Sequence, residues 1–298
     1  MSSQQMAGPS ASPGEVIMTA PLGLIAGLGD LPVAIAENAA ATGQGVYVMR
    51  LKGFEEPRLA AYPGAVVGLG EIGKMFSLLK QAGCEDVLFA GIVKRPNFKD
   101  LKLDLRGAAL LPKVLAEAGK GDDALLRLMV KEVEKQGFRV IGSDAAHAAL
   151  LAPSGLVGGP APSEAAMSDI ARGAHVVAAL GDLDIGQGCV VCDGLVLAVE
   201  AQEGTDAMLD RCAALPEAIR GTPAARRGVL VKRPKPAQER RIDMPTVGVS
   251  TVEKVAAAGL AGLAVEAGGA LMLGRAEMQE SAERLGVFLY GFDPGLGA

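Results

Sequence analysis

The chain has 298 residues and a formal net charge of −5, which is long enough for two domains that each bury a core. Half of the residues are hydrophobic, yet only 3% are aromatic, so Ala, Val, Leu and Ile must fill the cores. The acidic balance argues against general binding of nucleic acid, which requires a basic surface. Four cysteines without a recognisable signal peptide favour a reducing, cytoplasmic setting, and no apolar run is long enough to span a bilayer.

In the first half of the chain, short apolar runs alternate with helical stretches. Residues 1–17 are rich in Ser, Pro, Gly and Gln, and we interpret them as a disordered leader or a remnant of an expression tag. Strands are expected at 22–26, 46–49, 66–67, 87–90 and 138–141, and helices from Leu31 onward, at 71–82, near 105–118 and at 122–136. This alternation is typical of parallel βαβ units, so residues 18–152 are predicted to form a Rossmann-like α/β domain with a mostly parallel sheet.

A change of composition separates this half from the rest. Residues 151–168 are rich in Gly, Pro and Ser, which indicates an interdomain linker, placed here at 153–165. Beyond it, helices are expected near 163–172 and at 207–214, 251–258 and 275–284, and strands at 188–192, 195–199, 229–232, 261–266 and 286–290. Ser250 and Glu253 have the spacing of a capping box for the helix at 251–258. Residues 166–298 are therefore predicted to form a mixed α/β domain that contains a hairpin.

The hairpin is the most informative segment, because acidic residues surround two apolar strands. Asp193-Gly194 joins the strands and fits a type I′ turn. The acids near it are Asp182, Asp184, Glu200, Glu203 and Asp206. Carboxylates gathered at a strand–helix junction repel one another, and a divalent cation such as Mg²⁺ or Mn²⁺ would offset that repulsion. The segment therefore points to phosphate chemistry.

Two loops of the first half are candidates for contact with a phosphate. Gly27-Leu28-Gly29-Asp30 follows a strand and precedes a helix, so its backbone N–H groups either face a diphosphate or simply form a tight βα turn. It lacks the third glycine of the dinucleotide fingerprint. Lys94-Arg95 follows a strand at the carboxyl edge of the sheet, where open α/β sheets bind ligands, although a solvated loop has the same composition.

A basic loop in the second half carries one conspicuous carboxylate. Residues 232–245 hold five cationic side chains, two acids and three prolines. Lysines and arginines converging on a diphosphate would neutralise the charge that develops as a P–O bond breaks. Asp243, between Ile242 and Met244, is a candidate metal ligand or base for water. The alternative is a solvated run of charges.

Other chemistries find little support. Cys189 and Cys192 would face opposite sides of a strand, which disfavours zinc. His147 and His175 are isolated, which disfavours a nucleophilic triad.

Six segments together resemble one known family, the LpxI-type UDP-2,3-diacylglucosamine pyrophosphatases. They are IAGLGDLP (25–32), FAGIVKRPNF (89–98), GDDALL (121–126), LDIGQGCVV (183–191), VEAQEGTDAMLDR (199–211) and KRPKPAQERRIDMPTVGVSTV (232–252). The match runs in order from Leu22 to Tyr290. One departure is Glu239, where the family pattern leads us to expect Asp.

The resemblance implies a metal-dependent hydrolase of lipid A biosynthesis. Water would attack the β-phosphorus of UDP-2,3-diacylglucosamine, which gives UMP and 2,3-diacylglucosamine 1-phosphate (lipid X). It also implies an active site in the cleft between the two domains and a homodimer. A lipid product further implies peripheral contact with the cytoplasmic face of the inner membrane.

On this reading, each candidate residue has an expected role. Asp243 binds the metal or positions the water, and Glu200, Glu203 and Asp206 form the acidic pocket around the metal. The groups expected to contact phosphate, sugar or nucleotide are Thr205, Gln187, Lys232, Lys235, Gln238, Arg241, Lys94, Arg95, Gly27, Gly29 and Asp30.

Two other functions remain open from the residues. A nucleotide-dependent oxidoreductase is favoured only by the turn at Gly27–Gly29, and Arg50-Leu51-Lys52 stands where a ribose-binding acid would be expected. A non-catalytic sugar-nucleotide sensor would use the acids to hold a structural cation.

Overall fold

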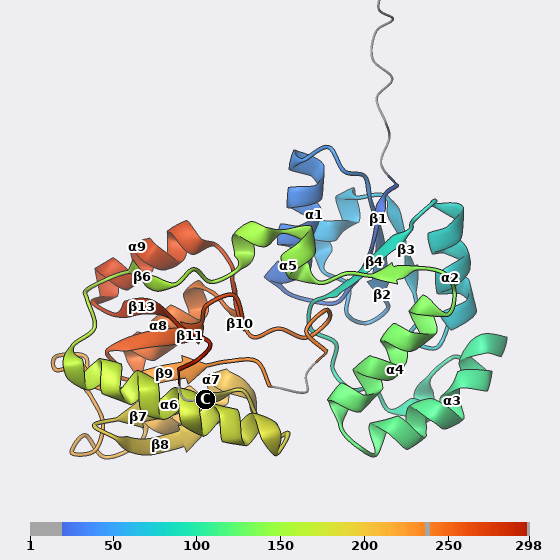
Figure 1. Ribbon diagram of the computed structural model, residues 1–298. Coiled ribbons are helices and arrows are strands. Elements are labelled where there is room, and N and C mark those ends of the chain that lie inside the picture. The colour runs from blue at the N-terminus through green and yellow to red at the C-terminus, as the bar shows by residue number, and fades with distance from the viewer. Residues whose placement is uncertain (1–19, 236–238, 297–298) are drawn as a thin grey trace, which may run out of the picture.

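The computed structural model describes residues 20–235 and 239–296. The expected leader, residues 1–17, and Gln238 lie outside the described residues. Figure 1 shows two α/β domains side by side, as the sequence predicts. Within the described ranges, no helix is long and apolar enough to cross a membrane.

The N-terminal domain is built on a five-stranded sheet in which every pairing is parallel. Its strands are β1 (Leu22–Ala26), β2 (Val46–Leu51), β3 (Gly64–Val67), β4 (Asp86–Ala90) and β5 (Arg139–Val140). The order β3-β2-β1-β4-β5 is that of a Rossmann-type sheet. The prediction of a Rossmann-like domain is therefore confirmed.

Helices cover both faces of this sheet (Figure 1). They are α1 (Asp30–Ala41), α2 (Ile72–Gln81), α3 (Leu105–Ala118), α4 (Asp122–Glu134) and α5 (Ser143–Ala146), with 3₁₀ turns η1 (Pro57–Ala61), η2 (Phe98–Asp100) and η3 (Ala148–Leu150). Successive strand residues point to opposite faces, so Leu24 packs in the cluster under α1 whereas Ile25 packs in the cluster under α2, α3 and α4. A strand buried on both faces explains the uninterrupted apolar runs of the sequence.

The C-terminal domain has a mixed six-stranded sheet in the order β6-β13-β11-β9-β7-β8. Its strands are β6 (Gly155–Gly158), β7 (Gly188–Cys192), β8 (Leu195–Val199), β9 (Val229–Lys232), β11 (Gly262–Glu266) and β13 (Phe288–Phe292). Its helices are α6 (Glu164–Asp182), α7 (Gly204–Ala213), α8 (Val249–Ala257) and α9 (Arg275–Leu285). Strands β10 (Thr246–Val247) and β12 (Leu271–Met272) form a separate small parallel sheet.

The hairpin β7–β8 has the predicted bounds, and its turn has the predicted shape. Asp193 and Gly194 both have positive φ, at 50° and 78°, as a type I′ turn requires. Their backbone N–H groups donate to the buried carboxylate of Asp169, at 3.0 Å and 2.7 Å. Helix α6 thereby holds the hairpin turn through the Asp169 carboxylate.

The structure differs from the sequence reading in several local respects. Helix α6 extends to Asp182, well beyond the helix expected near 163–172, and α5, β10 and β12 are not among the expected elements. Residues 155–158, inside the range expected to be a linker, pair with β13 as the edge strand β6, because the exposed edge of β13 offers hydrogen-bond partners that composition cannot reveal. Helix α8 begins at Val249 with Gly248 as its N-cap, so Ser250 lies inside the helix. The side chain of Thr251 accepts from the Gly248 N–H at 3.4 Å, which replaces the expected capping box.

The two domains are joined by the small sheet and the segment that precedes β6. Leu151 bridges to Leu271, and Leu271 is buried within a core cluster of the N-terminal domain. The guanidinium of Arg275 donates to the carbonyls of Ala149 and Leu151, at 2.5 Å and 2.6 Å.

Candidate active site

An apolar cavity of about 440 Å³ lies in the N-terminal domain beneath helices α3 and α4. Its helical walls carry Leu110, Leu111, Val114, Leu125, Leu126 and Met129, and Ile25, Leu51 and Phe89 line it from the sheet side. Its size is that of an ordinary ligand pocket. A Cβ at Gly107 would lie 2.1 Å from the carbonyl oxygen of Gly70, so glycine permits α3 to start this close to the sheet loops.

The mostly apolar lining also includes three charged side chains. Lys94 and Arg95, in the loop after β4, line the cavity together with Asp243 from the C-terminal domain. Arg95 donates to the carbonyl of Ala118 at 2.5 Å and lies 5.9 Å from the ring centroid of Phe98. The cavity therefore combines an apolar interior with two cations and one carboxylate.

Asp243 lies in a compact turn that the N-terminal domain holds in place. The N–H groups of Ile242 and Asp243 both donate to the Glu239 carbonyl, at 3.0 Å and 3.1 Å. Ile242 also packs against the N-terminal core. This burial of the neighbouring side chain directs the turn toward the cavity.

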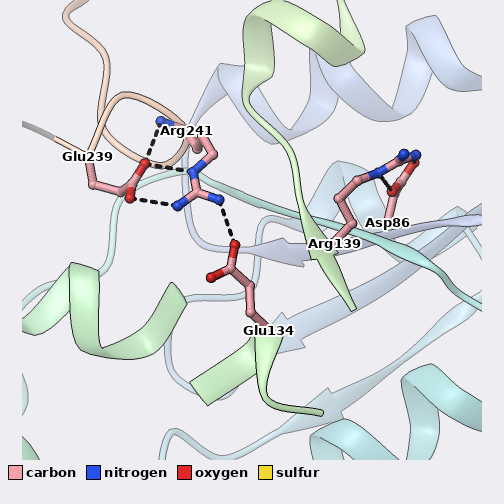
Figure 2. A network of polar contacts seen from close by, with 5 residues as sticks. All are labelled: Asp86, Glu134, Arg139, Glu239 and Arg241. Atoms are coloured by element: carbon pink, nitrogen blue, oxygen red, sulfur yellow. Dashed lines mark hydrogen bonds and ion pairs between the residues drawn. The ribbon is translucent and has the colours of Figure 1, made fainter. Parts of the chain in front are cut away.

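Charged side chains fasten the same turn to helix α4. Figure 2 shows the Arg241 guanidinium between two carboxylates: it donates to both oxygens of Glu239 at 2.8 Å and to Glu134 at 2.7 Å. Arg241 holds the pKa of Glu239 below its usual value, and the two carboxylates raise the pKa of Arg241. The pair Arg139–Asp86, also in Figure 2, joins β5 to β4. Arg241 and Glu239 therefore shape the turn.

Asp123 is a second anchor, which the sequence reading missed. Its carboxylate is largely buried in the first turn of α4, pairs with Arg127 and accepts the backbone N–H of Glu239 at 3.2 Å. It lies in the segment GDDALL, which carries part of the family resemblance. That segment was the available signal, but only the fold shows that it meets the turn of Asp243.

A buried ionic cluster forms in the C-terminal domain at the ends of β8 and β9. Glu200 and Lys232 are 6% and 3% exposed, and Oε2 of Glu200 lies 3.4 Å from Nζ of Lys232. Thr205, in the first turn of α7, donates its hydroxyl proton to Glu200 Oε1 at 2.8 Å and accepts from Lys232 Nζ. Three of the candidate site residues, Glu200, Thr205 and Lys232, are thus brought together.

Small residues make room for this cluster. A Cβ at Gly188 would lie 2.4 Å from Oε2 of Glu200, and one at Gly186 would lie 1.9 Å from the carbonyl oxygen of Glu200. The oxygen Oε2 is buried without a hydrogen-bond partner, although the Lys232 ammonium is close. Burial of a carboxylate that lacks a hydrogen-bond partner at one oxygen costs free energy, even beside a buried lysine. Such an arrangement marks a candidate functional site.

Three other acids of the hairpin region are paired with cations outside this cluster. Glu203 binds Arg211 at 2.5 Å, and Asp206 is 64% exposed with Lys254 at 3.8 Å. Asp184 binds Lys235 at 2.7 Å. Across the described ranges, no three His, Cys, Asp or Glu side chains gather in a way that could hold a metal ion. Glu203, Asp206 and Asp243 therefore do not form a ready cation site.

The glycine turn of the first domain is engaged within the chain. The N–H groups of Gly27 and Leu28 donate to the carbonyls of Ala90 and Ile92, at 2.9 Å and 3.1 Å. The N–H of Gly29 donates to a carboxylate oxygen of Glu56 at 3.2 Å. In this structure these backbone groups are therefore engaged within the protein, as in a tight βα turn.

Two other expected site residues, Asp30 and Gln187, also make contacts within the chain. Asp30 pairs with Arg58 at 2.8 Å on the surface. The carbonyl of Gln187 accepts from the Arg233 N–H at 3.1 Å.

The fold and the site define a class: a two-domain α/β protein whose Rossmann-like domain offers an apolar cavity with cations and a carboxylate from the second domain beside it. Such a site suits a molecule with a long apolar part and an anionic head. The family model described as the LpxI N-terminal domain matches residues 21–150, and the one described as the LpxI C-terminal domain matches residues 153–290. The chain belongs to the LpxI family.

A curated relative supports the same assignment. The chain is 52% identical over 273 residues to the UDP-2,3-diacylglucosamine pyrophosphatase LpxI of Caulobacter vibrioides (strain ATCC 19089 / CIP 103742 / CB 15). The alignment covers 92% of this chain and 98% of that protein.

Proposed function

We propose that this protein is a UDP-2,3-diacylglucosamine pyrophosphatase, which hydrolyses the diphosphate of its substrate to UMP and lipid X. The single observation that carries the proposal is Asp243 on the lining of an apolar cavity that also holds Lys94 and Arg95. The curated relative bears the name of this activity. Family membership over both domains supports transfer of the activity to this chain.

The cavity would hold apolar acyl substituents of the substrate. Its helical walls are almost wholly aliphatic, and burial of an acyl chain against them would supply about 0.8 kcal/mol per methylene. The anionic head would then lie at the polar part of the lining. Lys94 and Arg95 would neutralise charge there.

Asp243 would act on the water. A carboxylate held by the turn at Glu239–Asp243 can accept a proton from water that attacks the β-phosphorus, and the oxygen of that water would enter lipid X. Lys232 and Lys235 would offset the charge on the departing UMP, and Thr205 and Glu200 would hold the Lys232 ammonium in place. Gln187 and Gln238 remain proposed substrate contacts.

Arg241 is proposed to act indirectly. Its guanidinium is already engaged by Glu239 and Glu134, so we assign it to positioning the turn that carries Asp243.

A divalent cation, Mg²⁺ or Mn²⁺, remains part of the proposal. The described carboxylates do not form a ready site, and Glu203 and Asp206 are each paired with a basic side chain. We therefore propose that any required cation binds together with the diphosphate of the substrate, whose oxygens suit it.

The proposal also covers the location and assembly of the protein. A lipid product implies work at the cytoplasmic face of the inner membrane as a peripheral protein. The homodimer rests on the family resemblance.

The test is hydrolysis of UDP-2,3-diacylglucosamine in ¹⁸O water with Mg²⁺, followed by mass spectrometry, with an EDTA control. We expect UMP without label and lipid X with one ¹⁸O, and loss of turnover in EDTA. Label in UMP would overturn attack at the β-phosphorus, and full activity in EDTA would overturn the metal requirement. Binding without turnover would favour the sugar-nucleotide sensor.

The variant Asp243→Asn tests the role of the carboxylate. We expect kcat to fall by a factor of about 100 or more, the contribution usual for a general base, with KM changed little. Asp210→Asn, on the surface of α7, is the matched control and should retain full activity. Normal turnover by Asp243→Asn would refute the assignment.

A further inference from the structure

Helix α3 exposes apolar side chains where a surface helix normally carries charge. Leu105 is 94% exposed and Leu115 is 49% exposed. Between them, Ala108, Ala109 and Pro112 are also exposed. The spacing of these residues places them along one side of the helix, so α3 has an apolar outer stripe that nothing in the described chain covers.

The opposite side of the same helix faces the apolar cavity. Leu110, Leu111 and Val114 line the cavity, and α3 packs against α2 and α4. Figure 1 shows α3 at the outer edge of the N-terminal domain, on the side away from the C-terminal domain. Helix α3 therefore separates the cavity from the surroundings and is apolar on both sides.

The surface around this stripe is basic, although the chain as a whole is acidic. Residues 92–120 contain seven Lys and Arg side chains and three Asp and Glu side chains, in a chain of net charge −5. Lys99, Lys102, Arg106 and Lys113 are exposed. A further apolar side chain, Leu103, is 37% exposed in the segment that leads into the helix.

We propose that α3, with the preceding segment 99–104, docks on an anionic lipid bilayer and lies in its interface. The inference rests on the proposed function, because a diacylated substrate must enter from such a surface. Apolar side chains would enter the boundary of the acyl region while the lysines and arginines bind anionic headgroups. An acyl chain could then pass beside α3 into the cavity without crossing open water.

The basic charge around α3 favours a bilayer, rather than a second copy of this chain, as the partner of this surface. An isologous contact would set the same basic surface against itself, and like charges across an interface oppose association. An anionic bilayer complements both the apolar stripe and its basic border.

The test is flotation of the full chain with vesicles of phosphatidylglycerol and phosphatidylcholine, compared with phosphatidylcholine alone. The probe variant is Leu105→Glu/Leu115→Glu. The matched control is Leu156→Glu/Leu195→Glu, at sites on the C-terminal domain that are 50% and 59% exposed. Circular dichroism melting confirms that each variant is folded.

We expect the unmodified chain and the control to bind the anionic vesicles at least tenfold more tightly than the neutral ones, and the probe variant to lose that binding by tenfold or more. Equal flotation of probe and control, or no flotation of the unmodified chain, would overturn the proposal. A mass that halves in the probe variant by light scattering would instead identify a self-association face.

A second variant keeps the test decisive if the first does not fold. Lys99→Glu/Lys102→Glu alters only exposed cations outside the cavity lining, and it should abolish the preference for anionic vesicles. Retained preference would overturn the proposal.

Hydrolysis in detergent micelles separates this inference from the proposed function. Both probe variants should keep the unmodified rate there, because neither changes the cavity or Asp243. Absence of hydrolysis by the unmodified chain would reject the function while the vesicle result stood on its own.

Discussion

At the scale of single residues, the buried group of Glu200, Thr205 and Lys232 raises the question of whether it serves stability or chemistry. Thr205 has one proton, which it gives to Glu200, so its lone pairs are free for the Lys232 ammonium. Removal of one member of a buried ion pair leaves an uncompensated charge, whereas replacement of both is often neutral. The group can therefore be tested for a role beyond folding.

We predict that Lys232→Met lowers the free energy of unfolding by about 3–5 kcal/mol, the cost of leaving a buried partner charge alone. Lys232→Met/Glu200→Leu should regain much of that stability but none of the activity. Urea unfolding and kcat for both variants are the measurements. Recovery of activity along with stability would mean that the pair is purely structural.

At the scale of elements, the glycine turn between β1 and α1 binds a carboxylate of the protein itself. Glu56, at the start of η1, accepts the Gly29 N–H at the N-terminus of α1 and binds Arg58 at 2.7 Å. A carboxylate in this position also interacts favourably with the helix dipole. The hydrogen bond from the Arg58 side chain, with the backbone bonds from Gly29 and Arg58, lowers the pKa of Glu56 from the usual 4.5 to about 2, although burial acts to raise it.

Because this pKa is lowered on folding, its contribution to stability is present above pH 4.5 and is lost as the pH falls toward about 2. We predict that Glu56→Gln lowers the free energy of unfolding at pH 7 by about 1–3 kcal/mol. The difference from the unmodified chain should shrink between pH 4.5 and pH 2. Urea unfolding across this range measures it, and a difference independent of pH would contradict the assigned cause.

At the scale of the whole molecule, the two domains meet at the turn that carries Asp243. Helix α4 holds this turn by a largely buried acceptor, Asp123, and by a more exposed pair between Glu134 and Arg241. Because the two contacts differ in burial, their contributions to the free energy of unfolding also differ. Exposed pairs add at most about 1 kcal/mol, whereas loss of a charged acceptor to a buried donor costs more.

We predict that Asp123→Ala lowers kcat by tenfold or more and the free energy of unfolding by about 1–3 kcal/mol. Glu134→Gln, the matched change on the same helix, should alter stability by less than about 1 kcal/mol and leave kcat within twofold. Steady-state kinetics and urea unfolding distinguish them. Equal loss of activity in both variants would show that the exposed pair matters as much as the buried anchor.

The sequence predicted the elements and the class of fold because both depend on local patterns. The bounds of β7, β8 and β9 agree with the apolar runs, and the alternation of strands and helices implies parallel pairing. The short β6 had no such pattern. It is a strand because β13 lies beside it.

The sequence by itself determined the two α/β domains, the family resemblance and the candidate site positions, because periodicity and motifs are properties of neighbours along the chain. Only the tertiary structure decided which of these positions meet. It brought Glu200, Thr205 and Lys232 together, paired Glu203 and Asp206 with cations, and set Asp243 beside a cavity of the other domain. The partner of a side chain is chosen by packing between distant segments, and that choice cannot be read from spacing alone.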